Sequence, residues 1–440
     1  MINQTEAKNW FQNQFARFES ALNGQKSGVT HALRRDAMAR FQASEFPTMR
    51  HEEWKYTNLE SLFTHGLHLA SPADSASHAL DIRDDLTLDT EAYTVVFVNG
   101  YYDAKRSTIN APEKGLQIRL LSQCSDEEKA GILRALATET DESVFNTMHM
   151  ALVSDGVVID VAGGAVIGKP VHIQYFTVAE ESAPMTQPLT LIRVEKNAQC
   201  TVIEDYKTVG EKPFLTNART EIIVAENAVV DHARIQNESV KGYHISLTRL
   251  RQARSSNFMT TNITFGAALS RNLTIAHLDG EGIESTLNGL YMPKGRQHTD
   301  NRTIIHHAKP HCNSHELYKG IMDDHATAVF NGKIFVHPDA QKTDAKQSNN
   351  NLLLSKDATI NTKPQLEIFA DDVKCTHGAT IGRLEEKGMF YLRSRGIGYD
   401  EARSIMTLAF AEDIVSRIRH TALRKRLDTM LHERLNMKFE

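Results

Sequence analysis

The stretch from about Val153 to about Ile381 constrains the fold most, because it contains short β-like runs separated by turns and no segment with helical periodicity. A small turn motif recurs within it and precedes a β-like run each time: Lys196-Asn197-Ala198, Glu226-Asn227-Ala228, Asp324-His325-Ala326 and Lys356-Asp357-Ala358. The first two copies, and likewise the last two, lie about thirty residues apart, and turn–strand units at such a period are typical of a stacked β-solenoid.

A β-sandwich or β-barrel has compatible strand spacing and stays open as the alternative. The run Ser348-Asn349-Asn350-Asn351-Leu352-Leu353-Leu354 favours the solenoid, because stacked coils can satisfy asparagine amides in ladders. We therefore predict a mainly β protein whose solenoid core covers residues 153–382.

Helices are predicted before this core. Residues 1–68 form an N-terminal helical region, in which a second helix covers Thr30 to Gln42 and aromatic residues of the first recur at helical spacing: Trp10, Phe11, Phe15 and Phe18. Residues 69–152 combine a linker (about Leu69 to Leu86) with a small α/β segment. That segment has a strand at Thr94 to Asn99 and a helix from Ser125 to Ala137, which begins with a capping box of Ser125 and Glu128.

Helices return in residues 383–440, the predicted C-terminal helical domain. A short helix around Phe390 ends at Gly396, and Asp400 can N-cap the next helix. The apolar stripe of that next helix consists of Ala402, Ile405, Met406, Ala409, Phe410 and Ile414. A third helix runs to about Leu435. Terminal amphipathic helices either pack on their own domain or present a face to a partner, and the sequence leaves both open.

Composition narrows the class of protein. The chain has 440 residues, of which 41% are hydrophobic and 24% charged, and its formal net charge is −5. No basic stripe indicates nucleic acid, no long apolar run indicates a membrane span, and the N-terminus lacks a signal pattern, so we expect a cytoplasmic protein. Four scattered cysteines without a C-x-x-C argue against zinc or a resident cluster built from local ligands.

Two motifs match known functional sites only in part. Gly163 to Lys169 fits the start of a phosphate-binding loop, but Pro170 stands where Ser or Thr should, and a strand rather than a helix follows. The histidine-rich segment His306 to Glu316 could supply metal ligands, yet its spacing matches no compact metal loop. We therefore interpret the first as a turn and the second as an unassigned histidine-rich region.

Cys375 and His377 stand at the junction between the β region and the C-terminal helices. In a strand, residues two apart point to the same face, so a thiol and an imidazole would lie together there. Such a pair can bind a soft metal or handle a proton, although a buried cysteine and a hydrogen-bonded histidine are the more ordinary interpretation.

The residues around this pair resemble a known family. Lys374 to Ile381 (KCTHGATI), Phe390 to Ile397 (FYLRSRGI) and Glu401 to Arg403 followed by Ala409 to Ala411 are similar to the SufB/SufD family of the Suf iron–sulfur assembly machinery. Upstream segments fit the same pattern: Ala328 to Ile334, Lys342 to Asp344, Ser348 to Leu352, Lys363 to Ile368 and Glu53 to Thr57. The resemblance spans most of the chain and is looser between about Leu69 and Arg193. Arg393, Arg395 and the lack of an early cysteine-rich segment favour the SufD branch.

This resemblance implies a right-handed parallel β-helix, flanked by an N-terminal helical region and a C-terminal helical domain. It implies pairing with SufB, β-helix to β-helix, where His377 and Cys375 are candidate transient ligands for iron or a nascent cluster. It also implies docking of the SufC ATPase on the C-terminal helices, with these candidate contact residues: Phe390, Tyr391, Arg393, Arg395, Ala402, Ile405, Met406, Ala409 and Phe410.

The hypothesis that follows is a non-catalytic scaffold subunit with no tightly bound cofactor. Alternatives are a purely structural subunit without a metal role, or a β-solenoid enzyme such as a lyase or an acyltransferase. Lyases of this shape need clustered carboxylates for calcium, and solenoid acyltransferases show a strict six-residue repeat; neither pattern occurs in the sequence. A flavin in the whole complex, a homodimer without SufB, the stoichiometry, the sulfur donor and the role of the His298–His337 region stay open.

Overall fold

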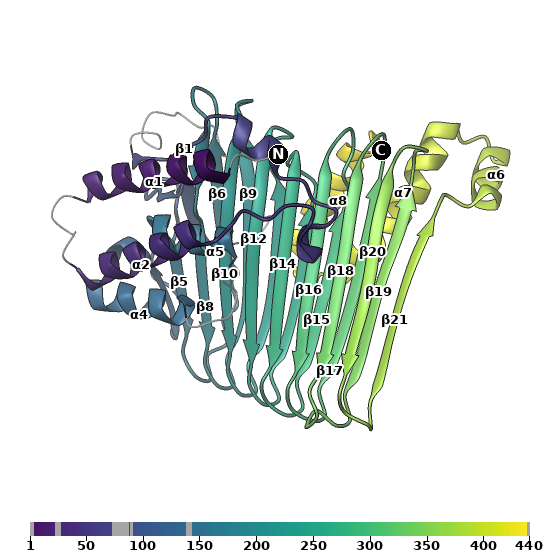
Figure 1. Cartoon of the computed structure of the whole chain (residues 1–440). Helices are drawn as coiled ribbons and strands as arrows, with labels where there is room; N and C mark the ends of the chain where they lie inside the picture. Colours follow the sequence, from purple (N-terminus) through teal and green to yellow (C-terminus); the bar gives the residue numbers. More distant parts are fainter. Residues whose placement is uncertain (1–3, 23–27, 73–87, 89–90, 138–142, 438–440) are drawn as a thin grey trace.

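A computed structural model describes residues 4–22, 28–72, 88, 91–137 and 143–437 of the chain. Two long sheets face each other along the molecule (Figure 1). One is eleven-stranded and consists of β1 (His68–Leu69), β4 (Leu116–Leu120), β5 (Val157–Val161), β7 (Pro184–Thr186), β8 (Leu189–Val194), β10 (Phe214–Val224), β12 (Gly242–Gln252), β14 (Leu269–Leu278), β16 (His298–His307), β18 (Thr327–Val336) and β20 (Thr359–Ile368).

The other sheet is ten-stranded and consists of β2 (Tyr93–Val98), β3 (Tyr101–Tyr102), β6 (Val171–Val178), β9 (Gln199–Val209), β11 (Val229–Asn237), β13 (Asn257–Thr264), β15 (Glu284–Tyr291), β17 (Asn313–Met322), β19 (Asp344–Leu353) and β21 (Lys374–Gly382). From β8 onward, successive strands alternate between the two sheets, and neighbours within a sheet pair in parallel. This is the predicted β-solenoid, and the sandwich or barrel alternative is excluded.

The length of a coil is read from the pairing register. Tyr243 pairs with Leu269, an offset of 26 residues, whereas Val157 pairs with Thr190, an offset of 33. The recurring turn motif marks where a coil bends: Asn197 and Asn227, the middle residues of the first two copies, have φ angles of 58° and 57°, and in the third copy the first residue, Asp324, has a φ of 55°. Asparagine and aspartate tolerate this left-handed conformation better than most residues, which explains their recurrence. Asp357 of the fourth copy does not adopt it.

The interior between the sheets is partly polar. A continuous apolar cluster fills most of it, with members such as Val95, Ile159 and Phe330. Beside it runs one row of buried threonines that pair from coil to coil: Thr190, Thr220, Thr248, Thr274 and Thr303. Buried polar groups need hydrogen-bond partners. Thr190 and Thr220 donate to the buried carboxylate of Glu204, which His232 also contacts at 2.9 Å.

The predicted asparagine ladder at Asn349 to Asn351 is not formed between coils. Asn351 donates to Asn349 of its own strand at 2.6 Å, and Asn349 donates to the Tyr291 hydroxyl at 3.0 Å. An amide contact between coils occurs instead at Asn272, which donates to Asn301 at 3.0 Å. Asn349 and Asn351 therefore find their partners on each other, on Tyr291 and on the carbonyl groups of Tyr318 and Thr380.

The N-terminal helices cover one end and part of an outer face of the solenoid (Figure 1). They are α1 (Gln4–Ala21), α2 (Val29–Ala43), α4 (Asp126–Ala137) and α5 (Val144–Leu152), with short 3₁₀ turns η2 (Glu52–Trp54), η3 (Glu60–Thr64) and η4 (Leu121–Gln123). The capping box is confirmed: Ser125 N–H donates to Glu128 and Glu128 N–H donates to the Ser125 hydroxyl. Helix α5 was not predicted, and the predicted linker lies mostly outside the described residues.

The C-terminal helices behave in two ways. Helix α6 (Glu386–Ser394) projects beyond the last coil and has no buried residue. Helices α7 (Tyr399–Val415) and α8 (Thr421–Arg434) lie back across the outer face of the ten-stranded sheet, in an apolar cluster that includes Ile203, Ile263 and Ile321 from the sheet.

For α7, the predicted N-cap was wrong and the predicted apolar stripe was right only at Ala402 and Ile414. Its N-cap is Gly398, and Asp400 lies in the first turn. The buried positions of α7 are Ala402, Thr407, Ala411, Ile414 and Val415, whereas Ala409 is exposed and Ile405, Met406 and Phe410 are half-buried. The helix therefore meets the sheet with a face rotated from the stripe of largest side chains. Among the described residues, no helix combines the length and apolar character needed to cross a membrane.

Candidate functional site

The last coil of the solenoid ends in two edge strands, β20 and β21 (Figure 1). Within the described residues, each pairs with an earlier strand on one side, β18 and β19 respectively, and with no strand on the other. Their inward-facing side chains continue the rows of the lumen but have no following coil to cover them. We call this surface the open end. Its exposed apolar side chains are Ile368, Phe369 and Ile381.

Backbone hydrogen bonding makes the two edges unequal. Lys374 N–H donates back to Thr343, and Thr359 N–H donates back to Ala326. Because successive peptide groups of a strand point to opposite sides, Cys375, His377, Ala379 and Ile381 direct their peptide groups to the free side of β21. On β20 the same reasoning places Pro364 on the free side, where it has no N–H to offer. Strand β21 is therefore the better edge for pairing with another chain.

Cys375 and His377 both lie on this edge, on the inward face, as the two-residue spacing predicted. They differ in exposure. His377 is exposed, whereas Cys375 is half-buried against an apolar cluster that includes Ile334, Val336 and Ala370. Burial raises the pKa of the Cys375 thiol. The sulfur is thus a neutral thiol in the chain alone, and becomes a good metal ligand only when it loses its proton.

Beneath His377 lies a row of polar side chains that the sequence analysis missed. His377 pairs with Gln347, and Gln347 pairs with Glu316 two coils from the end. Gln347 and Glu316 are 1% and 3% exposed, and Gln347 Nε2 donates to Glu316 Oε2 at 2.7 Å. Burial raises the pKa of Glu316 to about 7. The coil length could have indicated the row, but only with the register known.

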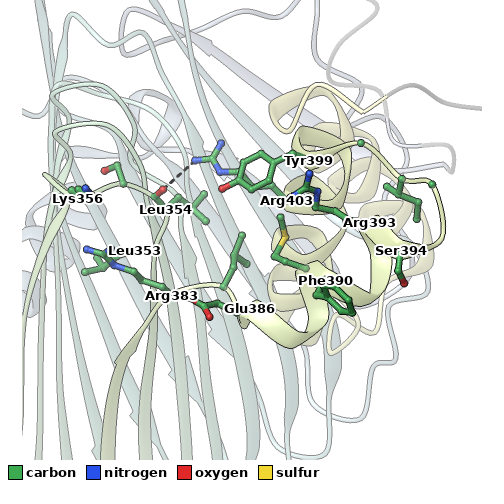
Figure 2. A pocket seen from close by; sticks show the side chains of 16 residues that line it. Leu353, Leu354, Lys356, Arg383, Glu386, Phe390, Arg393, Ser394, Tyr399 and Arg403 are labelled. Carbon is green, nitrogen blue, oxygen red and sulfur yellow. Dashed lines mark hydrogen bonds between the residues drawn. The ribbon is translucent and has the colours of Figure 1, made fainter.

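A second feature is a groove between α6, the start of α7 and the turns of the last coils (Figure 2). It has a volume of about 980 Å³, and its lining includes four basic side chains: Lys356, Arg383, Arg393 and Arg403. Arg403 donates to Asp323 at 2.8 Å, which fixes it to the solenoid. Phe390, Tyr391 and Tyr399 stand out beside the groove, with 76%, 58% and 58% of their surface exposed.

The structure divides the residues predicted to contact SufC. Phe390, Tyr391, Arg393 and Arg395 are exposed on and just after α6, where Arg395 stacks over Tyr391 at 5.2 Å. Ala402 is buried, and Phe410 is half-buried beneath Lys319, whose Nζ lies 4.3 Å from its ring centre. These two belong to the packing of α7 on the sheet. Of the other predicted contact residues, Ala409 is exposed and Ile405 and Met406 are half-buried on α7, so the α6 group is the most exposed part of the predicted set.

The histidine-rich region is built into the sheet rather than into a metal loop. His307 is buried and contacts the Ser314 hydroxyl at 2.8 Å, and Cys312 is buried as well. His306 stacks on His277 with ring centres 4.8 Å apart, and burial together with His277 and His337 lowers the pKa of His306 to about 4. No group of three or more His, Cys, Asp or Glu residues in the described part of the chain is arranged to hold a metal ion. The loop-like segment at Gly163 to Lys169 is a turn that leads into β6, as predicted.

Fold and site together define a β-solenoid whose last coil ends in a pairing edge, β21, beside an exposed helical projection, α6. Comparison with known proteins gives its family. Residues 175–410 match the family model described as SUF system FeS cluster assembly, SufBD core domain, and residues 5–173 match the SufBD protein N-terminal region. The chain belongs to the SufBD family of iron–sulfur cluster assembly proteins.

Its relatives include the iron–sulfur cluster assembly protein SufD of Escherichia coli, 35% identical over 392 residues, which cover 88% of this chain and 89% of the relative. A SufBD family protein of Synechocystis is 31% identical over 418 residues, covering 93% and 92%. The SufD of Bacillus subtilis is 29% identical over 304 residues, covering 68% of each chain. The predicted family is confirmed.

Proposed function

We propose that the chain is a non-catalytic scaffold subunit of a cytoplasmic complex that assembles iron–sulfur clusters. In this proposal the open end pairs with a SufB subunit, α6 and its groove dock the SufC ATPase, and iron or a nascent cluster forms at the SufB contact. The single observation that carries the proposal is the position of His377, which is exposed on the inward face of an edge strand whose other side pairs with no strand in the described part of the chain.

Pairing through β21 is supported by the physics of sheet edges. An unpaired row of N–H and C=O groups is a template for another strand, and the apolar side chains of the open end would be covered at the same time. The open end also exposes the cross-section of the lumen. A second solenoid that ends in the same way would continue both the sheets and the interior rows.

A cluster at this contact would be shared between subunits. Cys375 and His377 offer two donors roughly 6.6 Å apart along the strand, taking the usual rise per residue. Cluster irons are usually held by four thiolates in total, so donors of the partner would complete the set. The cluster is cargo in this proposal, and the chain holds it only transiently.

Docking on α6 is supported by what that helix exposes. Phe390 and Tyr391 are aromatic, Arg393 and Arg395 are charged, and aromatic and arginine side chains are enriched at the energetic centre of interfaces. A partner that moves α6 would act directly on the open end, because β21 ends at Gly382 and α6 begins at Glu386.

The test is co-purification with the other Suf subunits, followed by cluster reconstitution. We expect His377→Ala to form the complex but to lose cluster assembly. We expect Phe390→Ala to lose the ATPase, whereas Phe369→Ala, an exposed phenylalanine at the open end, keeps it. Wild-type cluster assembly by His377→Ala would remove His377 from the mechanism. An anaerobic iron titration that finds no difference between the complex with His377 and that without it would favour the purely structural alternative.

A further inference from the structure

The row of side chains under His377 carries an inference that rests on the proposed function and adds positioning residues to it. In a solenoid, paired residues of neighbouring coils point the same way and stand about 4.8 Å apart. His377, Gln347 and Glu316 therefore form one file, which runs from the open end into the lumen. The first is exposed, and the other two are almost fully buried.

The amide of Gln347 is held in one orientation. Its Nε2 donates to Glu316 Oε2 at 2.7 Å. The same nitrogen fills the space left by a glycine: a Cβ on Gly332 would come within 2.3 Å of Nε2. With its nitrogen bonded to Glu316 and seated over Gly332, the amide is held in one orientation, so the place of its carbonyl oxygen is set as well.

That carbonyl oxygen, Gln347 Oε1, is buried and has no hydrogen-bond partner among the described residues. Leaving a buried acceptor unsatisfied is costly, and buried acceptors almost always have a donor. The next side chain outward in the same file is the imidazole of His377. Either ring nitrogen of an imidazole can carry the proton and donate it.

We propose that Gln347 Oε1 accepts a hydrogen bond from the His377 ring when a partner covers the open end. This bond fixes the protonated nitrogen inward and leaves the other nitrogen unprotonated and outward, ready to bind iron. Glu316 acts through Gln347, because it holds the amide that receives the imidazole. A histidine that binds metal is commonly oriented in this way by an acceptor on its other nitrogen.

The same reasoning separates Gln347 from its neighbours. Asn349 lies on the same strand and the same inward face, but it pairs with Ala379 rather than with an imidazole. Its amide is engaged by Tyr291 and the Tyr318 carbonyl. Asn349→Leu is thus a matched control, which damages the lumen to a similar depth without removing the acceptor under His377.

The experiment uses the whole assembled complex with this subunit labelled with ¹⁵N-histidine, and the His377 signals are assigned by their loss in His377→Ala. We expect one fixed tautomer of His377 in the wild type and in Asn349→Leu, and a mixture of tautomers in Gln347→Met. Glu316→Gln keeps an acceptor for the Gln347 amide and should retain the fixed tautomer, whereas Glu316→Leu should lose it.

An anaerobic Fe²⁺ titration of the same complexes supplies the second readout. We expect Gln347→Met to bind iron about 10–100-fold more weakly than Asn349→Leu. An unchanged His377 tautomer in Gln347→Met overturns the inference, whatever the iron affinity. If His377→Ala binds iron as well as the wild type does, the proposed iron role of His377 fails, and the tautomer measurement still decides whether Gln347 positions the ring.

Discussion

Arg426 donates hydrogen bonds of 2.7 Å to each of the two carboxylate oxygens of Asp205, which lies 221 positions earlier in the chain. The pair joins α8 to strand β9 of the solenoid, and His172 contacts the same carboxylate. Burial alone would raise the pKa of Asp205, but Arg426 and His172 outweigh it and hold that pKa well below its ordinary value. The end of the chain is thus fixed to an early coil by a buried ion pair.

Replacement of Arg426 by alanine should destabilise the protein strongly, because it leaves Asp205 as a buried charge with only His172 beside it. Losses of this kind are about 3–5 kcal/mol. The measurement is urea unfolding, together with hydrogen exchange of α7 and α8, which should open first. Arg424→Ala on the exposed side of α8 is the control, and equal stability of the two variants would contradict the role given to the pair.

Glu316→Gln should stabilise the protein above pH 7 and have no effect near pH 4. The pKa of Glu316 in the folded state, about 7, lies above the ordinary value of 4.5, so between these pH values the folded state binds the proton more tightly. Stability therefore falls as the pH rises through this window, and the full penalty applies above it. Removal of the charge should restore on the order of 1–3 kcal/mol at pH 8. Unfolding curves at several pH values test this, with the exposed Glu195→Gln as control; a gain that does not vary with pH would contradict it.

Gly320→Ala should cost about 1–3 kcal/mol through overpacking of the lumen. A Cβ at Gly320 would meet the ring of Tyr291 at 2.3 Å and Asn351 Oδ1 at 2.6 Å, and the Tyr291 hydroxyl is itself hydrogen-bonded to Asn351. The matched control is Gly378→Ala on the edge strand, where nothing lies within 4 Å. The measurement is the thermal unfolding midpoint of each variant. Similar midpoints would contradict the prediction and show that the side chains of the lumen rearrange to accept the added methyl group.

Ala379→Pro should leave the isolated chain folded but weaken pairing at the open end at least about tenfold, since it removes an N–H that points to the free side of β21. The replacement copies on β21 what Pro364 already does on β20. Ala379→Val keeps the N–H and is the control. Binding to the SufB partner by analytical ultracentrifugation or calorimetry checks the prediction, and equal affinity of the two variants would place the contact elsewhere.

The sequence allowed correct predictions for features that depend on residues close together in the chain. The left-handed turns at Asn197 and Asn227 indicated coils, and the alternation of a strand placed Cys375 and His377 on one face. The file of His377, Gln347 and Glu316 was not readable, because coils differ in length and the register is set only by three-dimensional pairing. The buried face of helix α7 was predicted incorrectly for a related reason. The stripe of largest side chains indicates one face, but the face that packs on the sheet contains Thr407 and Ala411.

The hairpin of α7 and α8 fixes the number of solenoid coils that lie beneath it. Three ion pairs connect this hairpin, which we call the strap, to the solenoid: Arg403 with Asp323, Arg419 with Asp231 and Arg426 with Asp205. Each position on the strap is therefore held against one particular coil. Inserting or deleting a whole coil between Asp205 and Asp323 would move these acidic partners out of reach of their arginines. Relatives that keep the strap should therefore vary in their turns and at the N-terminal end, and keep the number of coils beneath it.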